Sequence, residues 1–165
     1  DEARRMSEAP HFRFNPNAYE NSCLEESDDA CGVCGRACGW RYVGNIYMVG
    51  DSPVVCARCI ADGRLGRKYS CGFHDMEFSE EPDAALVEEI EVRTPGFATY
   101  NPFTWPVRDG MPMAFVGYGD DRDLLKAPGV LDAVEGVTGF RGASSNTLIF
   151  REVDGDGIEA VLDLD

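Results

Sequence analysis

Four cysteines in two pairs are the residues of this 165-residue chain whose types and spacing point most clearly to chemistry. Cys31 and Cys34 form one C-x2-C pair, and Cys56 and Cys59 form the other, with 21 residues between the pairs. Two thiolates three residues apart can curl around one ion, and zinc prefers four such ligands in a tetrahedron. We therefore predict one structural Zn2+ ion on these four cysteines, with no coordination position open to water or substrate.

Two other uses of the paired cysteines stay open at this point. An iron–sulfur cluster is also held by four cysteines, and Cys38 extends the local pattern to C-x2-C-x3-C. Redox exchange at either C-x2-C pair is the second alternative. We interpret Cys23, Cys38 and Cys71 as small thiols without a role. The alternative is that Cys38 or Cys71 replaces one of the four metal ligands.

Few other residues have a pattern that indicates catalysis. Cys71 and His74 stand close together and could form a nucleophile and its base, but we interpret His74 as an ordinary surface-loop residue. The run Asp154–Gly157 is expected to be a hairpin turn and not a calcium loop, because it lacks the distant Glu. The sequence contains no P-loop, no G-x-S-x-G and no H-E-x-x-H motif. We therefore expect a protein that is not an enzyme.

The charge balance limits the class of partner. The chain has 30 acidic and 15 basic residues, a formal net charge of −15. Such a surface argues against nucleic acid, whose phosphates need Lys and Arg, and it suits a basic protein partner. Solubility alone would explain the same composition.

The cellular compartment is predicted from cysteine usage and hydropathy. Seven cysteines is an odd number, which does not fit a domain built only from disulfides. No apolar run approaches the ~18 residues of a membrane helix, and no signal-peptide pattern is present. We expect a reduced, cytoplasmic protein without membrane contact.

The elements that position the cysteines are predicted from the residues around them. Residues 40–43 and 45–49 are aromatic and β-branched and favour a hairpin that turns at Gly44-Asn45. Residues 57–62 have helical composition, and Gly63 ends the helix. Before the first pair, we expect a short edge strand at 11–14 and a loop at 19–30.

The remainder of the chain is predicted to mix helices and strands. We expect a helix of about ten residues from Pro82, with Leu86, Val87 and Ile90 on its apolar face. The other expected elements are an irregular stretch at 64–81, a loop at 99–112, a buried strand at 113–118, a helix at 120–137 broken at Pro128-Gly129, and a hairpin of 147–153 with 158–163.

These elements predict an α+β fold in which a zinc-ribbon-like β module is followed by a mixed α/β part. Residues 1–30 would form an N-terminal extended segment, and residues 31–63 would form the zinc-ribbon-like module with its four cysteines. Residues 64–165 would form an α+β part packed on that module.

Several short motifs resemble those of the CbrC family, in the same order and at similar separations, over about residues 11–118. They are Phe12–Pro16, Cys31-x2-Cys34-Gly35, Val55–Gly63, Arg93–Phe97, Trp105-Pro106 and Ala114–Gly117. The resemblance implies a small bacterial cytoplasmic protein without established enzymatic activity, associated with colicin tolerance. It also implies further cysteines at positions that are Asp109, Met113, Glu152 and Gly155 here, so that this chain would keep one metal site only.

Together these points predict a non-enzymatic zinc-binding interaction protein. We expect a cytoplasmic immunity or tolerance factor that binds and neutralises a basic bacterial toxin, such as a nuclease. A regulatory zinc protein with another cytosolic partner is one alternative, and an enzyme that uses Cys71 and His74 is the other.

Overall fold

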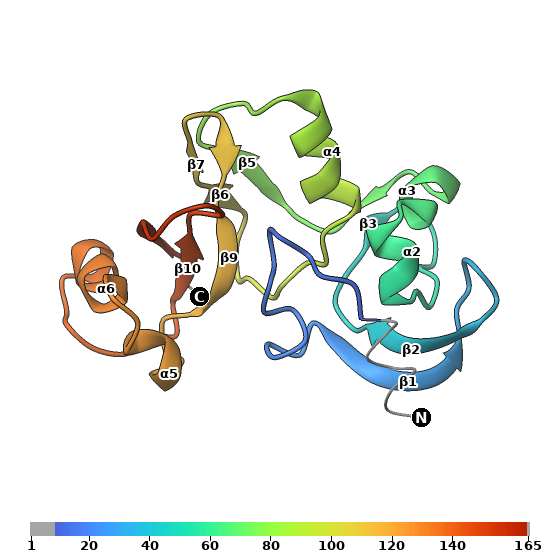
Figure 1. Cartoon of the computed structure of the whole chain (residues 1–165), viewed down its shortest axis with the longest axis horizontal. Coiled ribbons are helices and arrows are strands. Elements are labelled where there is room, and N and C mark those ends of the chain that lie inside the picture. Colours follow the sequence, from blue (N-terminus) through green and yellow to red (C-terminus); the bar gives the residue numbers. More distant parts are fainter. Residues whose placement is uncertain (1–8, 165) are drawn as a thin grey trace. The chain divides into compact units, whose positions relative to one another are not determined.

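The computed structural model describes residues 9–164, and these divide into two compact units (Figure 1). The first unit comprises residues 9–74 and 84–98, and the second comprises residues 75–83 and 99–164. The described residues form small sheets and five helices, so the predicted mixture of α and β structure is confirmed. The division into residues 1–30, 31–63 and 64–165 stays a prediction, and residues 1–8 of its first segment lie outside the described residues.

The largest sheet of the first unit is the antiparallel pair of β1 (Leu24–Ala30) and β2 (Ala37–Tyr42). The predicted hairpin of 40–43 with 45–49 is therefore wrong, and so is the predicted loop at 19–30. The acidic stretch of β1 is a strand because an exposed strand needs few buried residues and gains from cross-strand pairs. Glu25, for example, lies opposite Arg41 in the register and accepts a hydrogen bond from its guanidinium at 3.3 Å.

Shorter elements complete the first unit. The helices are α2 (Ala57–Ala61), α3 (Arg64–Lys68) and α4 (Ala84–Val92), and β3 (Tyr47–Met48) pairs with β4 (Cys71–Gly72). The helix after Cys56 is thereby confirmed. The helix predicted from Pro82 is also confirmed, although it begins two residues later.

The predicted edge strand at 11–14 is wrong, because this segment forms turns instead. Phe12 and Phe14 are both buried, at 4% and 0% exposure. The N–H of Asn15 donates to the carbonyl of Phe12 at 3.1 Å. Two large apolar side chains in a short segment therefore anchor a turn in the core of this unit.

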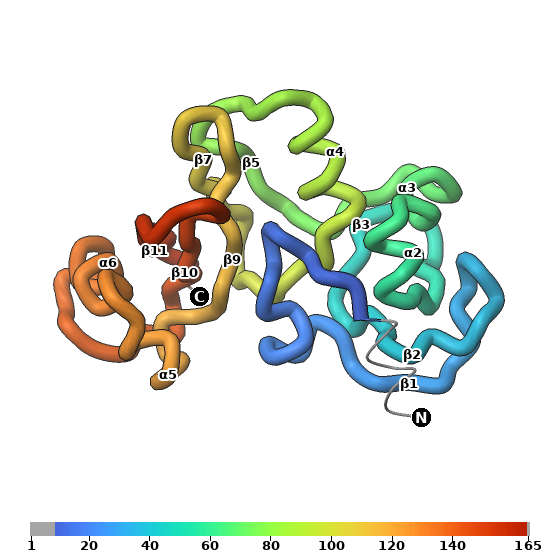
Figure 2. Tube along the Cα trace, in the orientation of Figure 1, coloured from blue at the N-terminus to red at the C-terminus, as the bar shows by residue number. Residues whose placement is uncertain are grey.

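The second unit is built on a three-stranded antiparallel sheet in the order β11-β10-β9 (Figure 2). Its strands are β9 (Ala114–Tyr118), β10 (Thr147–Arg151) and β11 (Ile158–Leu162), which confirms the predicted buried strand and hairpin. Two helices, α5 (Arg122–Leu125) and α6 (Val130–Thr138), flank Pro128-Gly129, as predicted. Val130 and Val134 of α6 pack with Ile149 and Ala160 of the sheet.

The loop predicted at 99–112 is wrong, because this stretch contains strands. They are β6 (Phe103–Trp105), β7 (Val107–Arg108) and β8 (Met111–Pro112), and β6 pairs in parallel with β5 (Met76–Phe78). The indole N–H of the fully buried Trp105 donates to the carbonyl of Met113 at 2.9 Å. The irregular stretch predicted at 64–81 also contains short elements, namely α3, β4 and β5.

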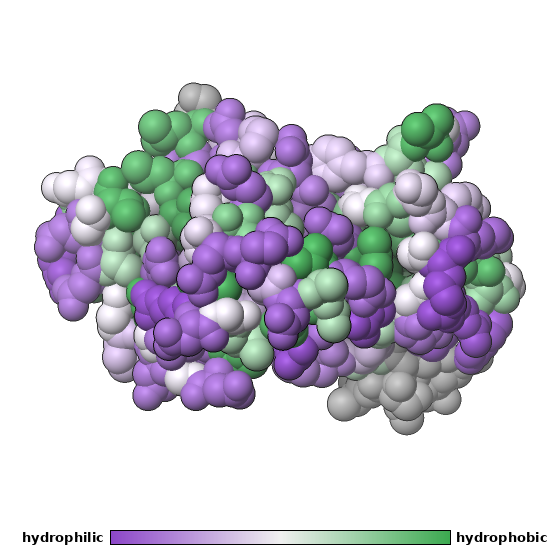
Figure 3. Space-filling view, turned by 90° about the horizontal axis from the view of Figure 1, so that it is seen from above, coloured by the Kyte–Doolittle hydropathy of each residue, from purple (hydrophilic) through white to green (hydrophobic). Residues whose placement is uncertain are grey.

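One face of the molecule is seen in the space-filling view. Figure 3 shows hydrophilic residues over much of one face, with hydrophobic residues between them in small groups. Among residues 9–164, no helix has the length and apolar character needed to cross a bilayer.

Candidate metal centre

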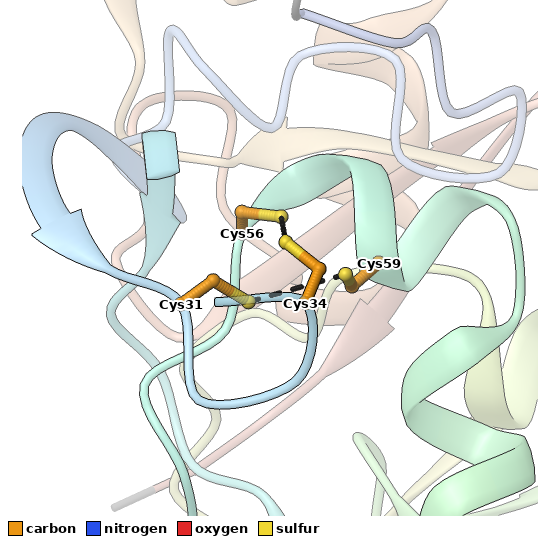
Figure 4. Close-up of side chains that lie close together, drawn as sticks. All are labelled: Cys31, Cys34, Cys56 and Cys59. Carbon is orange, nitrogen blue, oxygen red and sulfur yellow. Dashed lines mark hydrogen bonds between the residues drawn. The ribbon is translucent and has the colours of Figure 1, made fainter. Parts of the chain in front are cut away.

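The four paired cysteines come together in the first unit. Cys31 and Cys34 lie in the turn between β1 and β2, Cys56 directly precedes α2, and Cys59 lies within α2. Their side chains point toward one another (Figure 4). All four Sγ atoms lie within 4.8 Å of one another, with Cys31 and Cys59 3.9 Å apart and Cys34 and Cys56 4.0 Å apart. The structure thus forms the cluster that the sequence predicts.

The first pair is held by a tight turn. The N–H of Cys31 donates to the carbonyl of Arg36 at 2.8 Å, and the N–H of Gly35 donates to the carbonyl of Cys31 at 2.9 Å. Gly35 has a φ of 77°, in the left-handed region where a side chain would be strained. A glycine after the second cysteine therefore lets the chain fold both thiols to one side.

The second pair is tied to the first by backbone hydrogen bonds. The N–H of Gly32 donates to the carbonyl of Val54 at 2.7 Å, and the N–H of Tyr42 donates to the carbonyl of Val55 at 3.0 Å. These bonds fix the segment before Cys56 between the cysteine turn and β2. The β1–β2 hairpin consequently positions both pairs.

The site is largely closed to solvent. Cys56, Cys59 and Cys31 have exposures of 0%, 1% and 2%, and only Cys34 is partly exposed. With three of the four cysteines buried, solvent and substrate could reach an ion held here only from the side of Cys34. The arrangement therefore suits a structural role.

Hydrogen-bond donors surround the sulfur atoms. The N–H of Val33 lies 3.4 Å from the Cys31 sulfur, and the guanidinium of Arg58 lies 3.9 Å from the Cys34 sulfur. The same guanidinium donates to the carbonyls of Ala37 at 3.0 Å and of Cys38 at 3.3 Å. Arg58 thus links the cluster to β2, a role that the sequence interpretation missed. The available signal was a basic residue inside the second C-x2-C pair.

The cluster ionises unevenly. Although burial raises the pKa of the Cys34 thiol, hydrogen bonds from the Arg36 backbone and the Arg58 guanidinium outweigh it and lower this pKa to about 6. Burial, together with the neighbouring thiols, raises the pKa of Cys56 and Cys59. A divalent cation would offset the repulsion among four thiolates and so favour their joint ionisation.

The cluster geometry fits a single metal ion. Metal–sulfur bonds of about 2.3 Å at tetrahedral angles separate the sulfur atoms by about 3.8 Å. Two of the sulfur separations, 3.9 Å and 4.0 Å, are close to this value and almost double the length of a disulfide bond, and all of them are within 4.8 Å. Four cysteines thus lie close enough together to hold one metal ion.

The other three cysteines stay outside this cluster. Within the described residues, the group that could hold a metal contains neither Cys38 nor Cys71. Cys38 is fully buried in β2, and burial together with the nearby cluster thiols raises its pKa to about 12. Cys23 is buried, and the Asn15 side chain lies 3.8 Å from its sulfur.

Cys71 and His74 lie near each other in the chain but lack the electrostatics of an activated pair. Burial raises the pKa of the Cys71 thiol in β4. Burial lowers the pKa of His74 to about 4 against hydrogen bonds with the backbone of Thr94 and Ile90, and its ring lies 5.4 Å from that of Phe97. Both groups are therefore uncharged near neutral pH. His74 does lie in a loop, between β4 and β5, but it is only partly exposed and its Nε2 atom is buried.

Comparison with known proteins identifies the family. The sequence profile of an uncharacterised protein family, UPF0167, matches residues 9–152. The chain belongs to the UPF0167 family. No solved structure matches the chain.

Curated members of the UPF0167 family share this similarity. A UPF0167 protein of Pseudomonas aeruginosa is 33% identical over 102 residues, which cover 59% of this chain and 57% of that protein. UPF0167 proteins of Mycobacterium bovis and Mycobacterium tuberculosis are each 26% identical over 137 residues, covering 81% of this chain and 73% of theirs. The chain thus spans little more than half the length of the Pseudomonas protein.

The predicted membership of the CbrC family is wrong. The matching profile is that of UPF0167, which is a different family. Short motifs such as a C-x2-C pair followed by glycine arise wherever a turn must present two thiols to a metal, so they do not by themselves separate families. The association with colicin tolerance was implied by that resemblance alone, so it is no longer supported.

Proposed function

We propose that this UPF0167 protein is a non-catalytic interaction protein in which one zinc ion stabilises the first unit and the acidic second unit binds a basic protein. The distribution of charge between the two units is the observation that supports a basic partner. The described residues of the second unit include 16 acidic and 5 basic residues, a net charge of −11. Those of the first unit include ten acidic and eight basic residues, a net charge of −2.

This segregation favours a partner over solubility as the reason for the acidity. Solubility requires only that charge be spread over the whole surface. Charge concentrated on one unit instead creates a field that attracts a basic protein and raises its association rate. A basic nuclease-like toxin domain belongs to this class of partner and is the first to test.

Zinc is the proposed metal because of the ligand set and its closure. Four thiolates in a small tetrahedron are typical of structural zinc sites. The sulfur separations of 3.9 Å and 4.0 Å support a single ion, and the burial of three of the four ligands supports a structural role. Redox exchange is disfavoured, because a metal-bound thiolate cannot at the same time form a disulfide.

The partner is tested by calorimetric titration of the zinc-loaded chain with a basic toxin domain encoded beside its gene. We expect a Kd in the micromolar range or below at about 50 mM salt, with clear weakening at about 300 mM salt. An acidic domain of similar size serves as the control. If the basic domain does not bind, and cells that express it are not protected, the proposed partner is wrong.

The enzyme alternative has its own test. Replacing Cys71 by Ser should leave partner binding and cell protection unchanged, because the thiol is half-buried and its pKa is raised. If a Cys71→Ser variant of unchanged stability loses its function, the enzyme alternative is favoured instead.

A further inference from the structure

A groove in the second unit combines an apolar lining with two exposed carboxylates. It has a volume of about 430 Å3 and is lined by Asp75, Met76, Glu77, Phe103 and Leu162, with three further residues. Phe103 is buried, whereas Leu162 keeps 42% of its surface exposed. No basic residue lines this groove.

The strands around the groove have few neighbours. Met76 and Glu77 belong to β5, which pairs with β6 only, and Leu162 belongs to β11, which pairs with β10 only among the described residues. Strands with one partner retain backbone groups on the other edge that can bond an added strand.

One side of the groove is held in place by a buried carboxylate. Asp163 directly follows Leu162, is only 5% exposed, and accepts hydrogen bonds from the N–H of Tyr100 at 2.7 Å and of Asn101 at 2.9 Å. These bonds join the end of β11 to the segment before Phe103. Tyr100 and Leu164, which adjoin these bonds, are exposed by 63% and 58%. The structure thus presents exposed apolar side chains next to the groove on a preorganised support.

We propose that this groove binds an extended, basic segment of a partner protein, in which lysines or arginines alternate with apolar residues. The inference rests on the proposed function, since it assumes a basic partner. Asp75 and Glu77 are two residues apart in extended backbone, which separates their Cα atoms by about 7 Å. Cationic side chains at positions i and i+2 of an extended segment have the same spacing, so both carboxylates can be paired at once. Met76, Phe103 and Leu162 then cover the apolar side chains of the segment.

The charge term is tested with two variants of equal charge. The Asp75→Asn/Glu77→Gln variant removes the carboxylates of the groove, and the Asp120→Asn/Asp123→Asn variant removes two exposed ones that do not line it. The probe is a labelled Lys-Leu-Lys-Leu-Lys peptide, titrated by fluorescence anisotropy against the zinc-loaded full chain. We expect the groove variant to weaken binding about five- to tenfold at low salt, and the control variant to weaken it less than about twofold.

The apolar term is tested with a Lys-Ser-Lys-Ser-Lys peptide of the same charge. We expect it to bind about tenfold more weakly, because it leaves the groove lining uncovered. In NMR spectra of the isotope-labelled chain, the Leu-containing peptide should shift the amide signals of Met76, Phe103 and Leu162 most.

The outcomes separate this inference from the proposed function. If the two variants lose affinity for the peptide equally, or if the two peptides bind with equal affinity, the groove is not the binding site. The proposal that the acidic surface attracts a basic partner would then still stand. Failure of the Leu-containing peptide to bind, when the basic toxin domain does bind, would also overturn the groove alone. If neither binds, both proposals are wrong.

Discussion

Replacing Arg58 by Met should loosen the metal cluster without touching any ligand. The guanidinium donates to the carbonyl of Ala37 at 3.0 Å and of Cys38 at 3.3 Å, and it lies 3.9 Å from the Cys34 sulfur. Methionine has a similar length but no donor, so the two carbonyls and the sulfur lose a charged partner. At about 1.5–3 kcal/mol for a hydrogen bond to a charged group, and with two of the three contacts long, we expect a loss of about 2–4 kcal/mol in the free energy of unfolding.

The same variant should bind zinc more weakly. Residues that hydrogen-bond to metal ligands typically contribute about 10- to 100-fold in affinity. We expect a decrease of this size for Arg58→Met, measured by competition with a chromophoric zinc chelator. The zinc affinity of Arg58→Lys should lie between those of the wild type and Arg58→Met. An ammonium keeps the charge but cannot reach three acceptors from one planar group.

A matched control is available on the next helix. Arg64 is 54% exposed and lies 3.3 Å from Asp62 in a surface ion pair. Arg64→Met removes the same charge near the module and should change stability by no more than about 0.5 kcal/mol. If Arg58→Met and Arg64→Met have the same zinc affinity and the same unfolding midpoint, then Arg58 does not support the cluster.

Three further sets of variants test other parts of the structure. The His74→Gln variant should lose less stability than the wild type between about pH 7 and about pH 5. The pKa of His74 is about 4 in the folded state and higher in the unfolded state, so the unfolded state binds the proton first as the pH falls. This difference lowers the free energy of unfolding of the wild type by about 1.4 kcal/mol per pH unit below about 6.5. Equal pH dependence of denaturant unfolding in the variant and the wild type would contradict this. Gly35→Ala should cost about 1–2 kcal/mol because of the φ of 77°. Gly136→Ala in the last turn of α6, where an added Cβ meets no atom within 4 Å, should instead stabilise by about 0.5–1 kcal/mol. Thermal unfolding of the zinc-loaded proteins measures both, and a stabilising Gly35→Ala would show that the turn is not strained. Trp105→Phe should cost about 2–4 kcal/mol, since it leaves the Met113 carbonyl without its 2.9 Å donor and opens a cavity; a loss below about 1 kcal/mol would contradict the buried position.

The cysteine cluster could be predicted because its geometry is mostly local. A C-x2-C pair with Gly35 behind it determines its own turn, and two such pairs need only a connection that brings them together. The connection itself was predicted incorrectly. Strand β2 pairs with β1, the acidic strand that precedes it in the sequence. The charged residues at 25–29 suggest a loop, and the sequence does not show that Glu25 pairs with Arg41 across the two strands.

In the second unit, the elements with a local signal were predicted and those without one were missed. The hairpin of β10 and β11 follows from two apolar runs around Asp154–Gly157, and the break before α6 follows from Pro128-Gly129. The parallel pairing of β5 with β6 joins Met76 to Phe103 over a long stretch of chain. Strands of two or three residues have no periodicity to detect, and only the buried aromatic rings of Phe103 and Trp105 mark the place.

Functional residues outside the cysteine motifs depend on three-dimensional contacts. Arg58 contacts the carbonyls of residues about 20 positions earlier in the chain, and its place inside the second C-x2-C pair does not by itself identify these acceptors. The sequence likewise does not show that the Nε2 atom of His74 is buried, because its neighbours in the chain say little about the residues that cover it in the fold. Charge could be counted from the sequence, but its concentration in the second unit required the division into units.

Metal analysis of the purified chain tests the central claim most directly. We predict about one zinc ion per chain, no iron or sulfide, and loss of both the zinc and the unfolding transition of the first unit when Cys31 and Cys59 are replaced by Ser. A Cys71→Ser variant should keep its zinc, because Cys71 lies outside the cluster. A brown protein with iron and sulfide, or full zinc content in the Cys31→Ser/Cys59→Ser variant, would contradict a structural zinc site on these cysteines.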